Sequence, residues 1–252
     1  MEIVKEIKRL KEIIDSAKSI VFLGGAGVSC ESGIPDFRSN LGIYNQKHNI
    51  NPEKILSHNF FMNQPKIFYD FYKEKFLYLD ALPNPGHFYL ADLEEIGKLN
   101  TVITQNIDGL HQKAGSVNVI ELHGNVYRNK CVKCSKEFDI DYIIKQANPV
   151  RCDECNGLVK PEVVLYNETL EEDNVINAVN SIIEADLLII AGTSLNVYPA
   201  AELIRFAKKK LLINLSRTSK DIFCDYVYYG KFGEICKEIS LKDNWQLYLK
   251  VL

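Results

Sequence analysis

Four of the seven cysteines stand in two short pairs whose spacing suits a metal ion. Cys131 and Cys134 enclose two residues, as do Cys152 and Cys155, and residues 135–151 separate the pairs. Each Cys-x-x-Cys turn presents two thiolates on one side, and a loop of this length brings the second pair round to complete a tetrahedron. Four thiolates saturate Zn²⁺ and leave no position for water, so the pattern predicts one structural zinc ion. The alternative is a group of buried or redox-active cysteines without metal.

A glycine-rich turn could bind a phosphate group. Gly24 to Gly27 directly follow the apolar run Ile20–Leu23, and Arg38, eleven residues after Gly27, offers a further phosphate partner. A glycine turn at a strand end can present backbone N–H groups to a phosphate. The match to the G-x-G-x-x-G fingerprint is incomplete, because Cys30 occupies the place of the third glycine and no acidic residue follows at the usual distance. A tight turn without a ligand therefore remains an alternative.

Polar side chains follow two other apolar runs. His123 comes directly after the run that ends at Leu122, and the stretch Thr104–Gly109 contains Gln105, Asn106 and Asp108. Carboxyl ends of parallel strands meet at one edge of a sheet, where such folds bind ligands. Histidine is the side chain most easily poised as a general base near neutral pH. A structural histidine and a simple Asn/Asp turn are the alternatives.

The elements that must position these residues can be read from the hydrophobic periodicity. Residues 2–17 have the pattern of an amphipathic helix, and short apolar runs then alternate with helix-like stretches. Buried strands that alternate with helices favour an α/β fold, in which a parallel sheet has helices on both faces. After Ile20–Leu23, the expected strands are Thr101–Thr104, Val117–Leu122, Leu187–Ala191, Lys210–Leu215 and Tyr226–Tyr229.

Two stretches do not fit this alternation. Residues 34–95 contain aromatic residues in helical blocks without a clear strand, and residues 124–162 contain the paired cysteines. Both are interpreted as insertions that form a second, smaller module beside the sheet. The cleft between the two modules would then lie at the carboxyl ends of the strands.

The composition excludes several classes of protein. The chain has 252 residues, and its net charge of -3 argues against a bulk nucleic-acid binder. No apolar stretch approaches the length of a membrane span, and the first residues carry charges where a signal peptide would be apolar. We expect a cytoplasmic protein without membrane or nucleic-acid partners.

Several motifs together resemble the motif series of the sirtuins, in the order found in that family. The similarity covers nearly the whole chain, through Gly25–Ser39, Thr104–His111, Glu121–Gly124, the two cysteine pairs, Val163–Glu168, Gly192–Leu195 and Pro199–Ala201. It implies an NAD-dependent protein lysine deacylase that transfers the acyl group to ADP-ribose and releases nicotinamide. It also implies a Rossmann-like NAD-binding domain formed by residues 1–33, 96–123 and 163–252. The helical insertion 34–95 and the zinc-ribbon insertion 124–162 would form the small domain.

The resemblance also implies roles for individual residues. His123 would be the general base, and Asn106 and Asp108 would hold the nicotinamide end of NAD. The expected NAD contacts are Gly25, Ala26, Gly27, Ser29, Ile34, Asp36, Phe37, Arg38, Tyr44, Gln105, Asn106, Ile107, Asp108, Gly192, Thr193, Ser194, Asn214, Ser216 and Phe232. An acyl-lysine peptide would lie extended between two segments and contact Val164, Leu165, Tyr166, Asn196, Val197 and Tyr198.

Three departures from the family pattern affect these expectations. Asn167 replaces a glycine, although asparagine tolerates a left-handed backbone best after glycine. Ser216 replaces an acidic residue, which predicts a weaker contact with the adenosine ribose. The stretch Tyr69–Tyr72 lacks the arginine with which some members bind acidic acyl groups, so neutral acyl groups are expected.

Two functions from other classes remain as alternatives. A mono-ADP-ribosyltransferase would use the same NAD pocket but leave ADP-ribose on a protein side chain. A zinc-ribbon module that binds nucleic acid without catalysis is disfavoured by the acidic pI of about 6.0.

Overall fold

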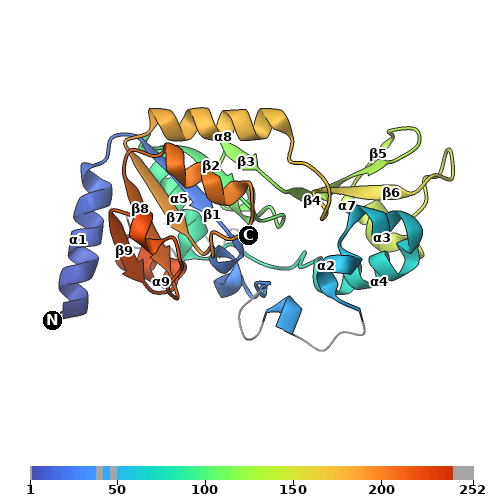
Figure 1. Ribbon diagram of the computed structural model, residues 1–252, viewed down its shortest axis with the longest axis horizontal. Helices are drawn as coiled ribbons and strands as arrows, with labels where there is room; N and C mark the ends of the chain where they lie inside the picture. Colours follow the sequence, from blue (N-terminus) through green and yellow to red (C-terminus); the bar gives the residue numbers. More distant parts are fainter. Residues whose placement is uncertain (1, 38–41, 46–49, 241–252) are drawn as a thin grey trace.

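The larger part of the molecule is built on one parallel sheet. The structure is a computed structural model that describes residues 2–37, 42–45 and 50–240. Six strands lie in the order β3-β2-β1-β7-β8-β9, and every neighbouring pair is parallel (Figure 1). Their bounds are β1 Ile20–Gly24, β2 Leu99–Thr104, β3 Val119–Glu121, β7 Leu187–Ala191, β8 Lys210–Asn214 and β9 Tyr226–Tyr229. These strands confirm the α/β class and the positions predicted from the apolar runs.

Helices cover both faces of this sheet, because alternate residues of each buried strand point to opposite sides. In β1, Ile20 and Phe22 join the core beneath α1 (Glu2–Ser16), α5 (Pro85–Glu95) and α9 (Phe232–Glu238). Val21 and Leu23 join the other core, beneath α8 (Glu172–Glu184) and the 3₁₀ segment Ala200–Phe206. Helix α8 runs along this second face in Figure 1.

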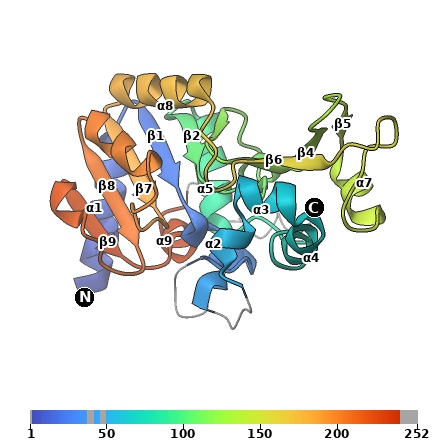
Figure 2. The ribbon, with the colours of Figure 1, turned by 45° about the vertical axis from the view of Figure 1, so that its right-hand side comes forward.

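A smaller unit extends from the sheet and has its own core. The strands β4 (Gly124–Cys131), β5 (Glu137–Phe138) and β6 (Val159–Val163) form an antiparallel sheet in the order β5-β4-β6. Four helices accompany it (Figure 2), namely α2 (Pro52–Ile55), α3 (His58–Asn63), α4 (Pro65–Lys75) and α7 (Ile140–Lys145). Fully buried aromatic side chains fill this core, among them Phe61, Phe68 and Tyr69.

Helix α5 belongs to the larger core, although its residues fall within the 34–95 range that the sequence assigns to the small module. Tyr89, Leu90 and Leu93 pack in the same cluster as β1 and β2. An aromatic helical pattern predicts burial, but it does not identify the core in which the helix is buried. We therefore propose that the boundary of the first insertion lies before Pro85.

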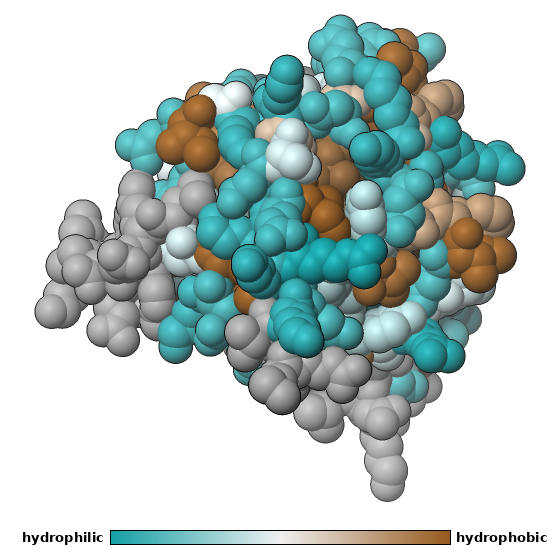
Figure 3. Space-filling model, turned by 90° about the vertical axis from the view of Figure 1, so that its left-hand side faces the viewer, coloured by the Kyte–Doolittle hydropathy of each residue, from teal (hydrophilic) through white to brown (hydrophobic). Residues whose placement is uncertain are grey.

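The described part of the chain contains no helix that is long and apolar enough to cross a membrane. On the face seen in Figure 3, hydrophobic residues form small separate patches among hydrophilic ones.

Candidate active site

A cavity of about 620 Å³ is formed by residues of both units. It collects side chains from the ends of β2 and β3, the turn after β1, the helix α4 and the segment after β6. The predicted residues that line it are Ala26, Ser29, Ile34, Phe37, Tyr44, Gln105, Asn106, Ile107, Asp108, His123, Val164, Leu165, Tyr166, Val197 and Tyr198. Residues that are far apart in the sequence therefore meet in one cavity, as expected for the carboxyl edge of a parallel sheet.

His123 is held in a single orientation at the wall of this cavity. Its Nδ1 lies 2.9 Å from the carbonyl oxygen of Gln105. A carbonyl can only accept a hydrogen bond, so Nδ1 carries the proton of the neutral ring and Nε2 is left as a proton acceptor. Burial lowers the pKa of His123, and the bond to Gln105 only partly opposes this shift. The ring is therefore neutral at physiological pH, as a general base must be.

A hydrogen-bond network fixes the two polar residues after β2. The Ser29 hydroxyl donates to Asp108 Oδ2 at 2.7 Å and accepts from Asn106 Nδ2 at 3.0 Å. Asp108 Oδ1 accepts from the backbone N–H of Leu110 at 2.9 Å. Burial raises the pKa of Asp108, although the hydrogen bonds from Leu110 and Ser29 oppose the shift. Ser29 thus orients an amide and a carboxyl group toward the same space.

Two glycine turns pack against each other beside this network. Gly27 N donates to Gly192 O at 2.8 Å, and a Cβ atom on Gly25 would lie 2.8 Å from the same oxygen. Only glycine permits this close approach of the turns after β1 and β7. Paired glycine turns at the ends of adjacent strands form the kind of backbone cradle that accepts a dinucleotide pyrophosphate, so these residues fit NAD.

Asn214 supports the second turn. Its side-chain oxygen accepts from Thr193 N at 3.1 Å, and its amide donates to Thr193 O at 2.7 Å. The half-buried Ser194 belongs to the same turn, and Ser216 is exposed beyond the end of β8. These residues lie at the carboxyl ends of β7 and β8 and are not among those that line the cavity.

The remaining NAD contacts expected from the sequence lie in different places. Asp36 is in the loop after the glycine turn, and its carbonyl oxygen accepts from Ile43 N at 2.9 Å. Phe232 is buried at the start of α9, where its ring stacks on Phe22 at 5.2 Å between ring centroids. Arg38 lies outside the described residues.

The expected peptide segments face the same cavity. Val164 follows β6, and its N–H donates to His123 O at 2.9 Å. The backbone of Tyr166 pairs with Leu56 and His58, so one edge of this segment is already occupied. Asn167 has a φ of 71°, which is the left-handed conformation that the replacement of glycine predicts. Asn196 is exposed and does not line the cavity.

The structure adds polar residues that the sequence did not reveal. Lys75 lines the cavity one helical turn after Tyr72, and its Nζ lies 2.9 Å from Glu74 Oε1. Glu168 also lines it and binds His58 Nδ1 at 2.7 Å and Lys160 Nζ at 3.0 Å. The helical spacing of Tyr72 and Lys75 could have predicted that Lys75 lines the cavity. The position of Glu168 depends on contacts between distant segments.

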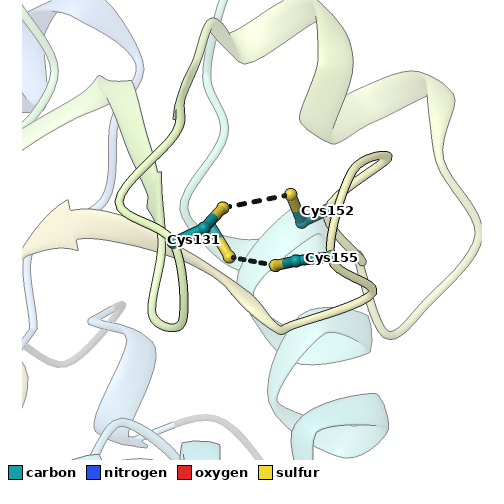
Figure 4. A group of neighbouring side chains, drawn as sticks. Cys131, Cys152 and Cys155 are labelled. Carbon is teal, nitrogen blue, oxygen red and sulfur yellow. Dashed lines mark hydrogen bonds between the residues drawn. The ribbon is translucent and has the colours of Figure 1, made fainter.

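The four paired cysteines come together in the smaller unit, and Figure 4 labels Cys131, Cys152 and Cys155 of this cluster. The Sγ atoms of Cys131 and Cys155 are 3.4 Å apart, those of Cys134 and Cys152 are 3.6 Å apart, and all four lie within 4.8 Å of one another. A tetrahedron with Zn–S bonds of about 2.3 Å has edges of about 3.8 Å, so the cluster fits one zinc ion.

Comparisons with known proteins agree with this geometry. A family model described as "Sir2 family" matches residues 25–199. A protein of Clostridium acetobutylicum named "NAD-dependent protein deacetylase" is 51% identical over 244 residues, which cover 95% of this chain and 100% of that protein. A protein of Clostridium tetani with the same name is 54% identical over 233 residues, which cover 90% of this chain and 94% of that protein.

Solved structures are similar over the same extent. The structure described as "Sir2-p53 peptide-NAD+" has a TM-score of 0.83 and 40% identity, and the match covers 92% of this chain and 96% of that chain. A second, of Sir2 with the inhibitor EX-527, 2'-O-acetyl-ADP-ribose and deacetylated p53 peptide, has a TM-score of 0.82 and 38% identity over the same shares of the two chains. Together with the family match over most of its length, these similarities show that the chain belongs to the Sir2 family.

Proposed function

We propose that this protein is an NAD-dependent protein lysine deacetylase. The observation that carries the proposal is an oriented His123 in the same cavity as Asn106 and Asp108, beside paired glycine turns. Relatives that are about half identical to the chain are named for this activity, which supports the proposal.

The residues of the cavity have distinct roles in this reaction. The acyl oxygen of the substrate lysine would displace nicotinamide from the anomeric carbon of NAD, so that ADP-ribose accepts the acyl group, and water would complete the release of free lysine. Asp108 and Asn106 bind and orient the carboxamide of the leaving group, and Ser29 holds both side chains in place. His123 Nε2 takes the proton of a ribose hydroxyl, so that this oxygen can attack the acyl carbon. Apolar residues such as Ile34, Phe37 and Ile107 keep water from the reacting centre.

The acylated peptide is proposed to bind in an extended conformation. The segments Val163–Glu168 and Val197–Tyr198 line the cavity, Asn196 adjoins the second, and the peptide is proposed to add a strand between the two segments. Recognition through backbone hydrogen bonds accepts many sequences, so we propose that the selectivity for the peptide sequence is weak.

We also propose that the protein is cytoplasmic and binds neither nucleic acids nor membranes. A zinc site of four thiolates needs reduced cysteines, which supports the cytoplasm as the location. The net charge of -3 supports the absence of nucleic-acid partners, and the lack of an apolar stretch of membrane length supports the absence of a membrane partner.

Product analysis of the His123→Ala variant tests this function. We expect the unaltered protein to convert NAD and an acetyl-lysine peptide into nicotinamide, deacetylated peptide and O-acetyl-ADP-ribose, all detectable by mass spectrometry. The variant should lose at least about 100-fold in rate, which is the usual contribution of a general base. Nicotinamide release with an unchanged peptide would instead indicate ADP-ribosyl transfer or NAD hydrolysis.

The pH profile provides an independent check. Because burial lowers the pKa of His123, the ring stays unprotonated to a lower pH than an exposed histidine. The value of kcat/KM should therefore stay constant as the pH falls to about 6.5 and decline only below it. A decline that begins well above neutral pH would contradict the role of His123 as the base.

A further inference from the structure

The carboxyl end of β8 carries a cluster of hydroxyl and cationic side chains, of which only Ser216 is among the expected NAD contacts. After Asn214 and Leu215 come Ser216, Arg217, Thr218, Ser219 and Lys220, and the first acidic residue is Asp221. Ser216 and Arg217 are both exposed. Hydroxyl groups and a guanidinium group that project from one strand end are a suitable set for binding a phosphate ester.

The position of this cluster relates it to the dinucleotide. β8 lies next to β7, and the two hydrogen bonds from Asn214 to Thr193 join the loop after β8 to the glycine turn after β7. On the other side, Gly230 N donates to Asn214 O at 2.9 Å, and the guanidinium carbon of Arg217 lies 5.9 Å from the centre of the Tyr229 ring. Under the proposed function, this end of the sheet receives the adenosine half of NAD.

The chemistry of the strand end determines which dinucleotide can bind. In dinucleotide-binding folds, a carboxylate that accepts from the 2'-hydroxyl of the adenosine ribose selects NAD, whereas a nearby arginine accommodates the 2'-phosphate of NADP. No acidic residue lies between Asn214 and Asp221, and Ser216 and Arg217 stand at this strand end instead. The repulsion that normally excludes a 2'-phosphate is therefore removed, and a cation is added.

The other charges around the cluster are compatible with an anion. The carboxylate of Asp221 accepts from Thr218 N at 3.0 Å, from the Thr218 hydroxyl at 2.6 Å and from the Tyr229 hydroxyl at 2.6 Å. Both of its carboxylate oxygens therefore accept hydrogen bonds, one from the loop after β8 and one from the end of β9. Lys220 supplies a second cation, with its Nζ 3.5 Å from the Tyr198 hydroxyl. The loop therefore carries two cations, Arg217 and Lys220, and one carboxylate that is bonded internally.

We propose that Ser216 and Arg217 form a subsite for the adenosine 2'-phosphate, so that this protein uses NADP as well as NAD. The proposal relies on the proposed function for the direction in which the dinucleotide lies. The chemistry is unchanged, because the phosphate is on the ribose that does not react. Water, NADP and acyl-lysine yield lysine, nicotinamide and an O-acyl ester of 2'-phospho-ADP-ribose.

Calorimetry of the whole protein with ADP-ribose and with 2'-phospho-ADP-ribose tests the subsite without requiring turnover. We expect the phosphorylated ligand to bind with a Kd within about threefold of that of ADP-ribose at low salt, and to weaken more steeply as salt is added. The Arg217→Gln variant should raise the Kd of the phosphorylated ligand about tenfold and change that of ADP-ribose less than about twofold.

Two further variants separate the subsite from a general charge effect. Ser216→Glu introduces a carboxylate at the strand end. It should raise the Kd of 2'-phospho-ADP-ribose about tenfold and lower the Kd of ADP-ribose. Lys208→Gln removes a positive charge from the segment before β8, where Lys208 Nζ contacts the carbonyl oxygen of Glu184, and should change neither Kd.

The outcomes distinguish this proposal from the proposed function. If ADP-ribose binds but its 2'-phosphorylated form binds more than about tenfold more weakly, or if Arg217→Gln weakens both equally, the subsite is wrong and the NAD site stands. If neither ligand binds, the placement of the adenosine half is wrong and both proposals fail. Nicotinamide release from NADP, measured beside release from NAD, then shows whether the bound ligand reacts.

Discussion

Lys75 is a cation in the wall of an otherwise mostly apolar cavity, and its charge is compensated by its neighbour. The Lys75 side chain is 26% exposed and Glu74 is 68% exposed, with 2.9 Å between Nζ and Oε1. An acyl group that carries a carboxylate would have to compete with Glu74 for this ammonium group. The absence of an arginine in Tyr69–Tyr72 and the pairing of Lys75 therefore both favour neutral acyl groups.

We expect a higher kcat/KM for acetyl-lysine than for succinyl-lysine peptides. Glu74→Gln should raise the value for succinyl-lysine about fivefold, because it releases an ion pair that contributes about 1 kcal/mol, and should leave the value for acetyl-lysine nearly unchanged. Lys75→Gln is the matched control and should not show this gain. Faster turnover of succinyl-lysine by the unaltered protein would refute the preference.

At the scale of the elements, the close contact between the glycine turns after β1 and β7 requires a glycine at position 192. Gly192 has a φ of 59°, and a Cβ atom there would lie 2.4 Å from Val28 N. Gly97 has a similar φ of 74°, but a Cβ atom there would meet no other described atom within 4 Å. An alanine at position 97 therefore measures the energetic cost of the left-handed backbone without a steric clash.

Gly192→Ala should therefore destabilise the protein more than Gly97→Ala. The latter should cost about 1 to 2 kcal/mol for the left-handed conformation alone. The former adds a backbone clash that pushes the turns apart, so its cost in urea unfolding should be larger and its affinity for ADP-ribose lower. Equal costs for the two variants would show that the turns are not in tight contact.

Helices α5 and α6 (Leu110–Lys113) bury two histidines against each other. The rings of His87 and His111 are 4.8 Å apart between centroids, and His87 Nδ1 accepts from Asn84 N at 3.2 Å. Burial lowers the pKa of His87, and the neighbouring His111 lowers it further. Burial also lowers the pKa of His111, to about 4. Both rings are neutral in the folded protein.

The unfolded chain protonates these two histidines at a higher pH than the folded protein does. The free energy of unfolding should therefore decrease as the pH falls below about 6.5. The contribution of His111 is fully present above that pH and is lost by pH 4, which amounts to about 3 kcal/mol for a shift from 6.5 to about 4. Urea unfolding at a series of pH values measures this loss. The loss should become smaller in His111→Gln, and an unchanged pH dependence in this variant would contradict the assignment.

The sequence predicts the strands of the large sheet well because each is a short apolar run buried on both faces. It does not show which core buries α5, because the pattern around Phe88 and Tyr89 is the same in either core. The cysteine cluster and the residues after β2 and β3 follow from spacing and strand order. The contacts of Lys75 with the cavity and of Glu168 with His58 could not be predicted from local pattern, since they arise where separate segments fold together.

At the scale of the whole molecule, we expect the small unit to depend on its metal site. Its helices and three short strands surround one aromatic core, and the two cysteine turns close the end of β4 and the segment before β6. A structural zinc ion contributes directly to the folding of such a module.

We expect one zinc ion per chain and loss of activity when a chelator removes it, although the metal performs no chemistry. Cys134→Ser should lose the metal and melt at a lower temperature, whereas Cys224→Ser, outside the cluster, should keep it. Metal analysis and thermal unfolding measure both effects. Full activity after complete removal of the metal would contradict a structural role.

The route of the chain between the two units determines how the cavity can change shape. The segment from β4 to β6 leaves the large sheet at His123 and Gly124 and returns at Val163 and Val164, and the bond from Val164 N to His123 O holds these two crossings together. Helices α2 to α4 are joined to the large unit by separate connections. A rotation of the β4–β6 segment would pivot about its paired crossings. Points near a pivot move least. The walls of the cavity far from the pivot could therefore separate to admit a peptide while His123 keeps its position relative to the large sheet.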